Sequence, residues 1–444
     1  VLHRALGTPE EETDVAVQEA VTGKAVRTLY GNIASLSLTK PVAVSILSAD
    51  VRKLGYRHDV DLGEDVARYY VLDGTVIAVE FPATTRFVYR SDLFPDGFQV
   101  ESRAILDIAL PDEIREQEIA FSNDGQKLYG TITAPTTIAG KIPLLFLVPD
   151  LGAFDADGDI VGYQTRIGRE LARGLAVRGV SVYRFDRRGI GASEGDYAAT
   201  SLASLISDAR VALALLRGVP FVDAAKIYAV GIGRGGILAG MLAASGAVSG
   251  VVTLSTSPDS LGAAWREQLE SALAREALPA ADVALFTERE EAFQNLVRTS
   301  TGTWDDLTFA EVRRSLPWMT ELEYARRAAA LPLPLLRDLL DADPLATFGA
   351  VTKTTLVVQG DKDVWVSTDD AFAITAAINA AQEGSATLSI VPDLNHILRP
   401  HTAPAAAGDA HLEKNVDLRV LELIADWCGV ESDMGAPGRL PSAM

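Results

Sequence analysis

The chain has 444 residues, of which 48% are hydrophobic and 23% are charged, and its formal net charge is −20. This length favours two domains, or one large domain with an insertion, and the composition is typical of a globular protein rather than a disordered one. The acidic excess argues against a nucleic-acid or anionic-membrane partner, and no apolar run approaches the roughly 20 residues of a membrane-spanning helix.

Residues 1–115 are predicted to form a smaller β-rich N-terminal domain of unknown role. An acidic stretch at its start, Pro9–Ala25, is expected to be helical. Apolar runs separated by turn residues then predict strands in SLSLTKPVAVSIL, ARYYVLDGTVIAVEF and TRFVYRSDLF. This part of the sequence carries no motif that indicates a chemical activity.

From Glu116 onward the sequence alternates between predicted strands and helices. Asp124-Gly125 predicts the turn of a hairpin. Apolar runs that end in polar or glycine-rich turns predict strands in PLLFLVPD, VSVYRFDRRG, KIYAVGIG, GVVTLST, TTLVVQGDKD and ATLSIVPD. Helices are expected at Ile167–Arg178, Ser201–Arg217, Asp369–Gln382 and His411–Cys428. The alternation predicts an α/β domain over residues 116–430, with a doubly wound, mostly parallel sheet covered on both faces.

A long insertion interrupts this alternation. Residues 258–343 are charged and helical in pattern and contain no convincing strand. Inserted helices of this kind commonly form a lid over a binding cleft, so we expect a helical lid here. An extra helical layer that serves stability alone is the alternative. The tail, residues 431–444, is predicted to be disordered.

The stretch IYAVGIGRGGILAG has two incompatible interpretations. Gly231, Gly233 and Gly236 match G-x-G-x-x-G, which binds dinucleotides at the start of a helix. The same letters match the nucleophile elbow G-x-S-x-G-G of a hydrolase, with Gly233 in place of the serine. A dinucleotide site normally lies in the first βαβ unit and is followed by an acidic residue after the next strand. Here several strands precede the glycines and the next strand ends in TLSTS, so the elbow is favoured.

Two polar residues follow the later predicted strands in the order that a hydrolase triad requires. Asp363 lies in VVQGDKDVWV and His396 lies in VPDLNHILR. The segment between them is long enough for one helix and one strand, so both side chains can emerge at the carboxyl edge of the sheet that also holds the elbow. The chain order is then nucleophile position, acid and base.

Residues 116–427 resemble an α/β-hydrolase of the serine aminopeptidase-like and dienelactone-hydrolase-like group, bacterial esterases and peptidases with a helical lid. The resemblance is carried by the segments YRFDRRGIGASEGDY, DADPLATFGAVTKTTLVVQGDKDVWV and VPDLNHIL. It implies an α/β-hydrolase fold and hydrolysis of a carboxylic ester or related acyl bond by a nucleophile-His-Asp triad. The implied partner is a small-molecule ester or acyl substrate, and no metal or organic cofactor is implied.

The sequence departs from this group at two places. In this chain, Ile232 and Gly233 replace the His-Ser pair of the usual elbow G-H-S-x-G-G. Pro149-Asp150-Leu151-Gly152 replaces the usual loop H-G-S-G. The backbone N–H groups of Leu151 and Arg234 can still form an oxyanion hole, because backbone donors survive substitution. Asp150 would oppose the negative charge there unless its side chain turns away or is protonated.

Glycine at the elbow has no atom that can attack an acyl carbon, so the chain is expected to be severely impaired as an esterase. Three explanations stay open: a deliberately disabled serine hydrolase, a natural pseudo-hydrolase that binds a ligand or protein partner, and an enzyme in which His396 and Asp363 act as a base without a covalent step. Asp150, Ile232 and Trp365 are the candidate substrate contacts, with packing as the simpler role for Trp365.

The remaining properties are weakly constrained by the sequence. A single cysteine, Cys428, excludes an intrachain disulfide and a thiolate metal cluster. Because the chain begins at Val1 without an apolar signal segment, we expect either a cytoplasmic protein or an exported one whose leader was removed. Neither the oligomeric state nor the acyl and alcohol specificity follows from the sequence.

Overall fold

The computed structural model describes residues 26–28, 31–33, 42–48, 51–61, 66–72, 75–81, 86–89, 110–160, 163–275, 280–401 and 414–430. The helix expected at Pro9–Ala25 and the tail expected at residues 431–444 lie outside these described residues. None of the described helices is long and apolar enough to cross a membrane.

The N-terminal residues that the structure describes are strands. β1 (Val26–Thr28) pairs with β2 (Gly31–Ile33). A five-stranded antiparallel sheet follows in the order β3-β4-β5-β6-β7. Its strands are β3 (Val42–Ser48), β4 (Val51–Asp61), β5 (Val66–Leu72), β6 (Thr75–Phe81) and β7 (Arg86–Tyr89). Each strand-like run predicted from the sequence overlaps one or two of these strands, and their grouping into a separate domain stays a prediction.

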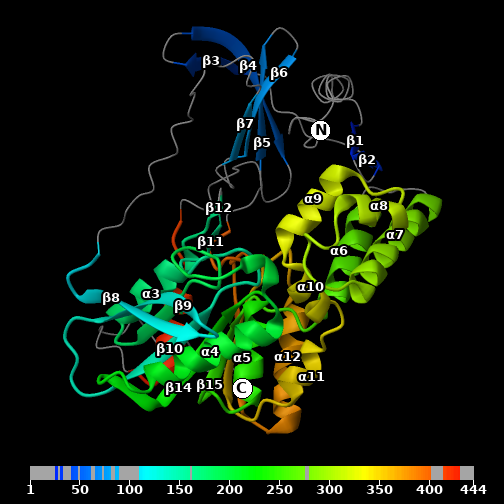
Figure 1. Cartoon of the computed structure of the whole chain (residues 1–444). Helices are drawn as coiled ribbons and strands as arrows, with labels where there is room; N and C mark the ends of the chain where they lie inside the picture. The colour runs from blue at the N-terminus through cyan, green and yellow to red at the C-terminus, as the bar shows by residue number, and fades with distance from the viewer. Residues whose placement is uncertain are drawn as a thin grey trace.

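The main sheet has eight strands in the order β17-β16-β15-β14-β10-β13-β9-β8 (Figure 1). Its strands are β8 (Ile114–Asn123), β9 (Gln126–Pro135), β10 (Ile142–Val148), β13 (Ser181–Phe185), β14 (Val222–Ile232), β15 (Gly250–Leu254), β16 (Thr354–Gly360) and β17 (Ala386–Val391). All neighbouring pairs are parallel except β8 with β9 and β9 with β13. The predicted doubly wound, mostly parallel sheet is therefore confirmed. Asp124 and Gly125 form the predicted hairpin turn, both with positive φ, as a tight two-residue turn requires.

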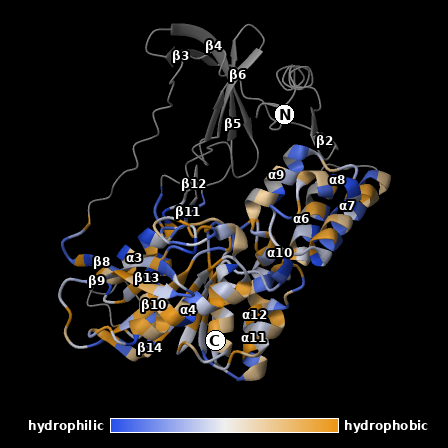
Figure 2. Ribbon diagram, viewed as in Figure 1, coloured by the Kyte–Doolittle hydropathy of each residue, from blue (hydrophilic) through white to orange (hydrophobic). Residues whose placement is uncertain are grey.

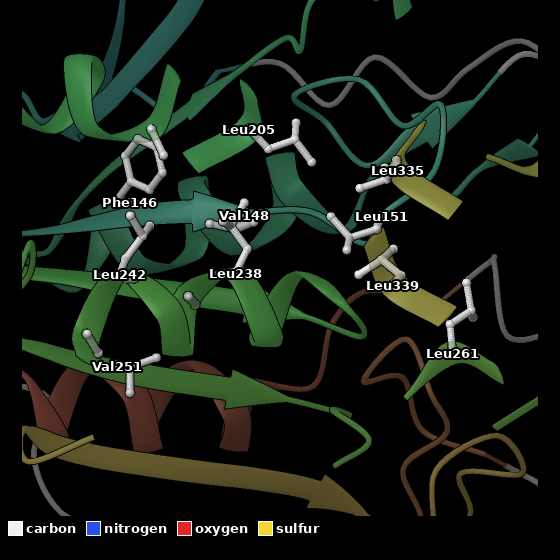
Figure 3. Packing of buried hydrophobic residues seen from close by; sticks show 14 of the residues in the cluster. Phe146, Val148, Leu151, Leu205, Leu238, Leu242, Val251, Leu261, Leu335 and Leu339 are labelled. Carbon is white, nitrogen blue, oxygen red and sulfur yellow. The ribbon is translucent and has the colours of Figure 1, made fainter. Parts of the chain in front are cut away.

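Alternate residues of the central strands pack on opposite faces of the sheet. In β10, Phe146 belongs to one buried cluster and Leu147 to the other. The first cluster includes apolar residues of α4 (Leu202–Leu216), α5 (Gly235–Ala244) and α12 (Thr368–Ala381). The second includes those of α3 (Ile167–Val177) and α13 (Leu418–Trp427). Figure 2 shows the apolar strands covered by helices with mixed surfaces, and Figure 3 shows Phe146, Leu238 and Leu242 packed together. The sheet is thus buried on both faces, as a parallel sheet requires.

Helix boundaries agree with the prediction within one residue for α3, α4 and α12. The helix predicted at His411–Cys428 is wrong at its start. It begins at Leu418, and residues 414–417 are not helical. The Asp417 carboxylate accepts a hydrogen bond from the Arg419 N–H and so caps the helix. An apolar pattern alone does not mark such a start, because the capping residue sets it.

Between β15 and β16 the described residues form helices and no strand. These helices are α6 (Leu261–Arg275), α7 (Ala280–Thr299), α8 (Phe309–Ser315), α9 (Glu321–Ala330), α10 (Leu333–Leu340) and α11 (Pro344–Gly349). Leu335 and Leu339 of α10 belong to the same buried cluster as Leu151, which lies in the loop after β10 (Figure 3). The insertion is therefore part of the same hydrophobic core as the sheet. Its action as a lid stays a prediction.

Two short strands, β11 (Asp159–Ile160) and β12 (Tyr163–Gln164), pair in the segment between β10 and α3. They belong to the loop that begins with Pro149.

Candidate active site

The carboxyl ends of four parallel strands place the candidate residues at one edge of the sheet. β10 ends at Val148, β14 at Ile232, β16 at Gly360 and β17 at Val391. The loops that follow these strands carry, in turn, Asp150, Gly233, Asp363 and His396. Such an edge is where open parallel sheets bind their ligands.

Glycine is required at each of the three elbow positions for a structural reason. Gly233 lies at the turn between β14 and α5, and its φ of 54° falls in the left-handed region that glycine adopts without strain. A Cβ on Gly231 would collide with the backbone of Gly236, and a Cβ on Gly236 would collide with Thr256. Close packing of the strand against its helix therefore explains Gly231 and Gly236, and no dinucleotide is needed to account for them.

The structure brings Asp363 and His396 together. His396 Nδ1 lies 2.9 Å from Asp363 Oδ2. Asp363 Oδ1 accepts the N–H groups of Trp365 at 2.8 Å and Val366 at 3.0 Å. Burial alone would raise the pKa of Asp363, but the hydrogen bonds and charge of His396 and the two backbone N–H groups together lower it. The carboxylate therefore stays ionised and can hold the His396 ring in one orientation.

Gln359 is a second partner of the acid that sequence reasoning missed. Its side chain is fully buried within β16, and Nε2 donates to Asp363 Oδ2 at 3.0 Å and to the Val366 carbonyl at 2.9 Å. Gln359 thereby fixes the carboxylate relative to the strand end. The signal in the sequence was a single polar residue near the end of the apolar run TTLVVQG.

Asp150 fills the predicted oxyanion hole with its own carboxylate. Asp150 Oδ1 accepts the N–H of Leu151 at 2.7 Å and the N–H of Arg234 at 3.0 Å. These are the two backbone donors that the sequence predicted for an oxyanion. The sequence left open whether the Asp150 side chain turns away from the hole. It turns into the site, where the two backbone N–H groups stabilise its carboxylate.

The Asp150 carboxylate also lies where a side chain at position 233 would begin. A Cβ on Gly233 would be 2.9 Å from Asp150 Cγ, 2.9 Å from Oδ2 and 3.2 Å from Oδ1. These separations are shorter than an ordinary van der Waals contact. Asp150 in this conformation and any residue other than glycine at 233 therefore exclude each other.

Arg187 holds the loop that carries Asp150. Its guanidinium, 3% exposed, donates to the carbonyls of Pro149, Asp150 and Gly152, each at 2.7 Å. Burial lowers the pKa of Arg187, and the charge of Asp150 opposes this shift. The buried cation thus fixes the backbone of the loop and lies close enough to Asp150 to interact with its charge.

Tyr197 lies in the same electrostatic environment, and sequence reasoning missed it. Burial raises its pKa to about 12, with the charge of Arg187 opposing and that of Asp150 adding to the shift. Its hydroxyl is buried and has no hydrogen-bond partner among the described residues. It is therefore a neutral phenol at physiological pH.

The other predicted contacts differ in exposure. Ile232 is 5% exposed and packs in the core at the end of β14, so its side chain offers little surface to a ligand. Trp365 is 55% exposed, and its role, in packing or in contact with a substrate, stays a prediction. Arg188, which follows Arg187 in the sequence, forms ion pairs with Asp208 and Asp124 instead.

Asp159, in the loop between β10 and α3, carries a carboxyl group whose protonation should affect stability. Burial, and then the charges of Asp155 and Asp157, raise the pKa of Asp159 to about 6, against an opposing hydrogen bond from the Arg166 N–H. Because the folded-state pKa is raised, the folded chain binds an extra proton between about pH 4 and pH 6, and stability rises as the pH falls through this range.

We therefore expect Asp159→Asn to raise the free energy of unfolding by about 1 kcal/mol at pH 7.5, after discounting for solvent screening. The gain should shrink at pH 4.5, where the native carboxyl is already protonated in the folded state. Urea unfolding of both proteins at the two pH values measures this. An equal gain at both values would contradict the assigned cause.

Several known proteins are similar to this chain. Esterase EstD of Thermotoga maritima is 23% identical over 317 residues, which cover 71% of this chain and 68% of the esterase. Among solved structures, Est1E from Butyrivibrio proteoclasticus with bound ferulic acid has 17% identity and a TM-score of 0.43, covering 70% of this chain and 97% of its own. The alpha/beta hydrolase GrgF from Penicillium sp. sh18 has 17% identity and a TM-score of 0.44, covering 71% and 98%. The sequence model of the alpha/beta hydrolase family matches residues 145–410. Since that match covers more than half of the chain, the chain belongs to the alpha/beta hydrolase family.

Proposed function

We propose that this esterase-like chain carries an ester-hydrolase site that has lost the serine step and has kept His396 and Asp363 as a working base. The single observation that carries the proposal is the position of the Asp150 carboxylate. It engages both oxyanion donors and takes the space of a side chain at position 233. The similarity to a protein named an esterase supports esters as the ancestral substrate class.

Ester hydrolysis through a seryl intermediate fails here for two separate reasons. Gly233 supplies no nucleophile, and loss of the serine in a hydrolase costs about 10⁶ in turnover. The oxyanion hole is filled by a negative oxygen, and loss of one such donor alone costs about 10² to 10³. An ester carbonyl therefore finds neither an attacking hydroxyl nor a donor for its oxygen.

The Asp150 carboxylate occupies the space that a side chain at position 233 would need. This supports Asp150 and Gly233 as residues that occur together in a natural protein, rather than a single deliberate replacement of serine by glycine. In a parent with serine at position 233, the Asp150 carboxylate would meet the serine Cβ and would have to lie elsewhere. The His396–Asp363 hydrogen bond, supported by Gln359, in turn supports a working base over a site kept only for binding a protein partner. The insertion at residues 258–343 is proposed as the lid that determines which substrate reaches this base.

The proposal is tested by an active-site probe for serine hydrolases. A fluorophosphonate phosphonylates an activated serine, so the native chain should show no adduct by intact mass spectrometry. It should also hydrolyse p-nitrophenyl butyrate no faster than His396→Ala does. A phosphonylated serine would show that the serine step had not been lost, and ester hydrolysis that depends on His396 would show that the site still accepts an ester carbonyl.

A further inference from the structure

We propose that Asp150 is the nucleophile of this site, acting on substrates that carry an anionic leaving group on an sp³ carbon, such as alkyl halides and alkyl sulfonates. The inference rests on the proposed function only in using His396 as the base. It assigns to the site a reaction that differs from carboxylic ester hydrolysis.

Compared with the resembling hydrolases, two neighbouring loops have exchanged a side chain. The elbow has lost its side chain at Gly233, and the loop after β10 has a carboxylate at Asp150, where the resembling hydrolases have glycine. The two changes meet in space, since Asp150 Cγ lies 2.9 Å from the Cβ position of residue 233. A reactive group is thus delivered to the same point from the neighbouring strand.

The two oxygens of the Asp150 carboxylate differ in their hydrogen-bond partners. Oδ1 accepts the N–H groups of Leu151 and Arg234. No described residue donates a hydrogen bond to Oδ2, which lies above Gly233. One oxygen is therefore anchored and the other is left with its lone pairs for attack. The carboxylate is a known type of covalent nucleophile in hydrolases.

The occupied oxyanion hole selects the substrate class. Attack on an acyl carbon puts negative charge on the substrate oxygen, which needs the donors that Oδ1 already occupies. Displacement at an sp³ carbon creates no such oxyanion, because the charge departs with the leaving group. The occupied oxyanion hole therefore disfavours acyl substrates and leaves alkyl substrates possible.

The reaction has two balanced steps. In the first, Asp150 Oδ2 forms a bond to the sp³ carbon as the bond to the leaving group breaks, and the leaving group takes that electron pair as an anion. The product is an alkyl ester of Asp150. Its carbonyl oxygen is Oδ1, which the N–H groups of Leu151 and Arg234 already hold.

In the second step, water attacks Asp150 Cγ while His396 accepts its proton. The oxyanion forms on Oδ1, so the same two N–H groups now stabilise it. Collapse breaks the bond between Cγ and the alkyl oxygen, and the alcohol leaves with the proton from His396. In the net reaction, the alkyl substrate and water give an alcohol, the leaving-group anion and a proton. The oxygen atom of the water stays in the Asp150 carboxylate, and the alcohol carries an oxygen that came from Asp150.

The test uses 1-bromobutane as the probe and the full chain. The native protein should release bromide and butanol, and a single turnover in H₂¹⁸O should place ¹⁸O in the peptide that contains Asp150. His396→Ala should stop after the first step and accumulate a butyl ester on Asp150, seen by intact mass and peptide mapping. Asp150→Asn should abolish bromide release, while the isosteric amide still accepts the two N–H bonds and keeps the fold.

Asp155→Asn is the matched control, because it changes another half-buried carboxylate of the same loop. This variant should keep both bromide release and the ¹⁸O label in the peptide that contains Asp150. The inference would be overturned if His396→Ala formed no butyl adduct and the native chain released bromide no faster than Asp150→Asn. It would also be overturned if the adduct formed only at another residue. A fluorophosphonate adduct in the native chain would instead overturn the proposed function, so the two failures are distinguishable.

Discussion

The double variant Gly233→Ser/Asp150→Gly is expected to hydrolyse p-nitrophenyl butyrate at least about 10³-fold faster than the native chain. Serine supplies the nucleophile, and glycine at position 150 frees the N–H groups of Leu151 and Arg234 for the substrate oxygen. The His396–Asp363 pair then has a hydroxyl to deprotonate. Steady-state kinetics and an acyl-enzyme mass measure the gain.

Neither single change should give this result. Gly233→Ser alone places its Cβ against the Asp150 carboxylate and leaves the oxyanion hole filled, and it also puts a side chain at φ 54°, a strain of about 1–3 kcal/mol. Asp150→Gly alone frees the hole but has no nucleophile. The two effects should therefore be strongly non-additive. Adding His396→Ala to the double variant should remove the gain. Full activity in Gly233→Ser alone would mean that Asp150 does not hold the hole.

Arg187→Met should lower the free energy of unfolding by about 3–5 kcal/mol. The change leaves the carbonyls of Pro149, Asp150 and Gly152 without the donors that the buried guanidinium supplies. It also removes the cation whose charge interacts with Asp150. Urea unfolding measures the loss.

Arg178→Met is the comparison for this change. Arg178 donates to the Gly174 carbonyl and lies 3.9 Å from Glu422, with its side chain 22% exposed. Its loss should cost less than about 1 kcal/mol, because partly exposed ion pairs contribute little. Arg187→Lys should recover only part of the stability, since an ammonium group cannot bond three carbonyls in the same geometry. Equal costs for Arg187→Met and Arg178→Met would contradict the role assigned to Arg187.

Much of the fold of residues 110–430 could be predicted because local patterns and topology agree. The apolar runs are buried strands, the Asp124-Gly125 turn makes the hairpin, and the mostly parallel pairing follows from the alternation with helices. The start of α13 was missed because Asp417, and not apolar periodicity, sets it. The grouping of residues 1–115 as one domain, with its role, stays a prediction.

The candidate site could be predicted only in part. Strand ends located Asp363 and His396 at one edge, and the backbone donors of Leu151 and Arg234 followed from the motif. The direction of the Asp150 side chain did not follow. It depends on a loop backbone that Arg187 holds from 37 residues away in the sequence, and on the space left by Gly233. Gln359 was missed because a polar residue inside a buried strand has many roles.

The position of the Asp150 carboxylate is the central claim, and a high-resolution crystal structure of the native chain tests it most directly. We expect Asp150 Oδ1 to lie within hydrogen-bond distance of both the Leu151 and Arg234 nitrogens, at 2.7 Å and 3.0 Å, with Oδ2 next to the Cβ position of residue 233. A carboxylate turned out to solvent, with water bound to the two N–H groups, would contradict it.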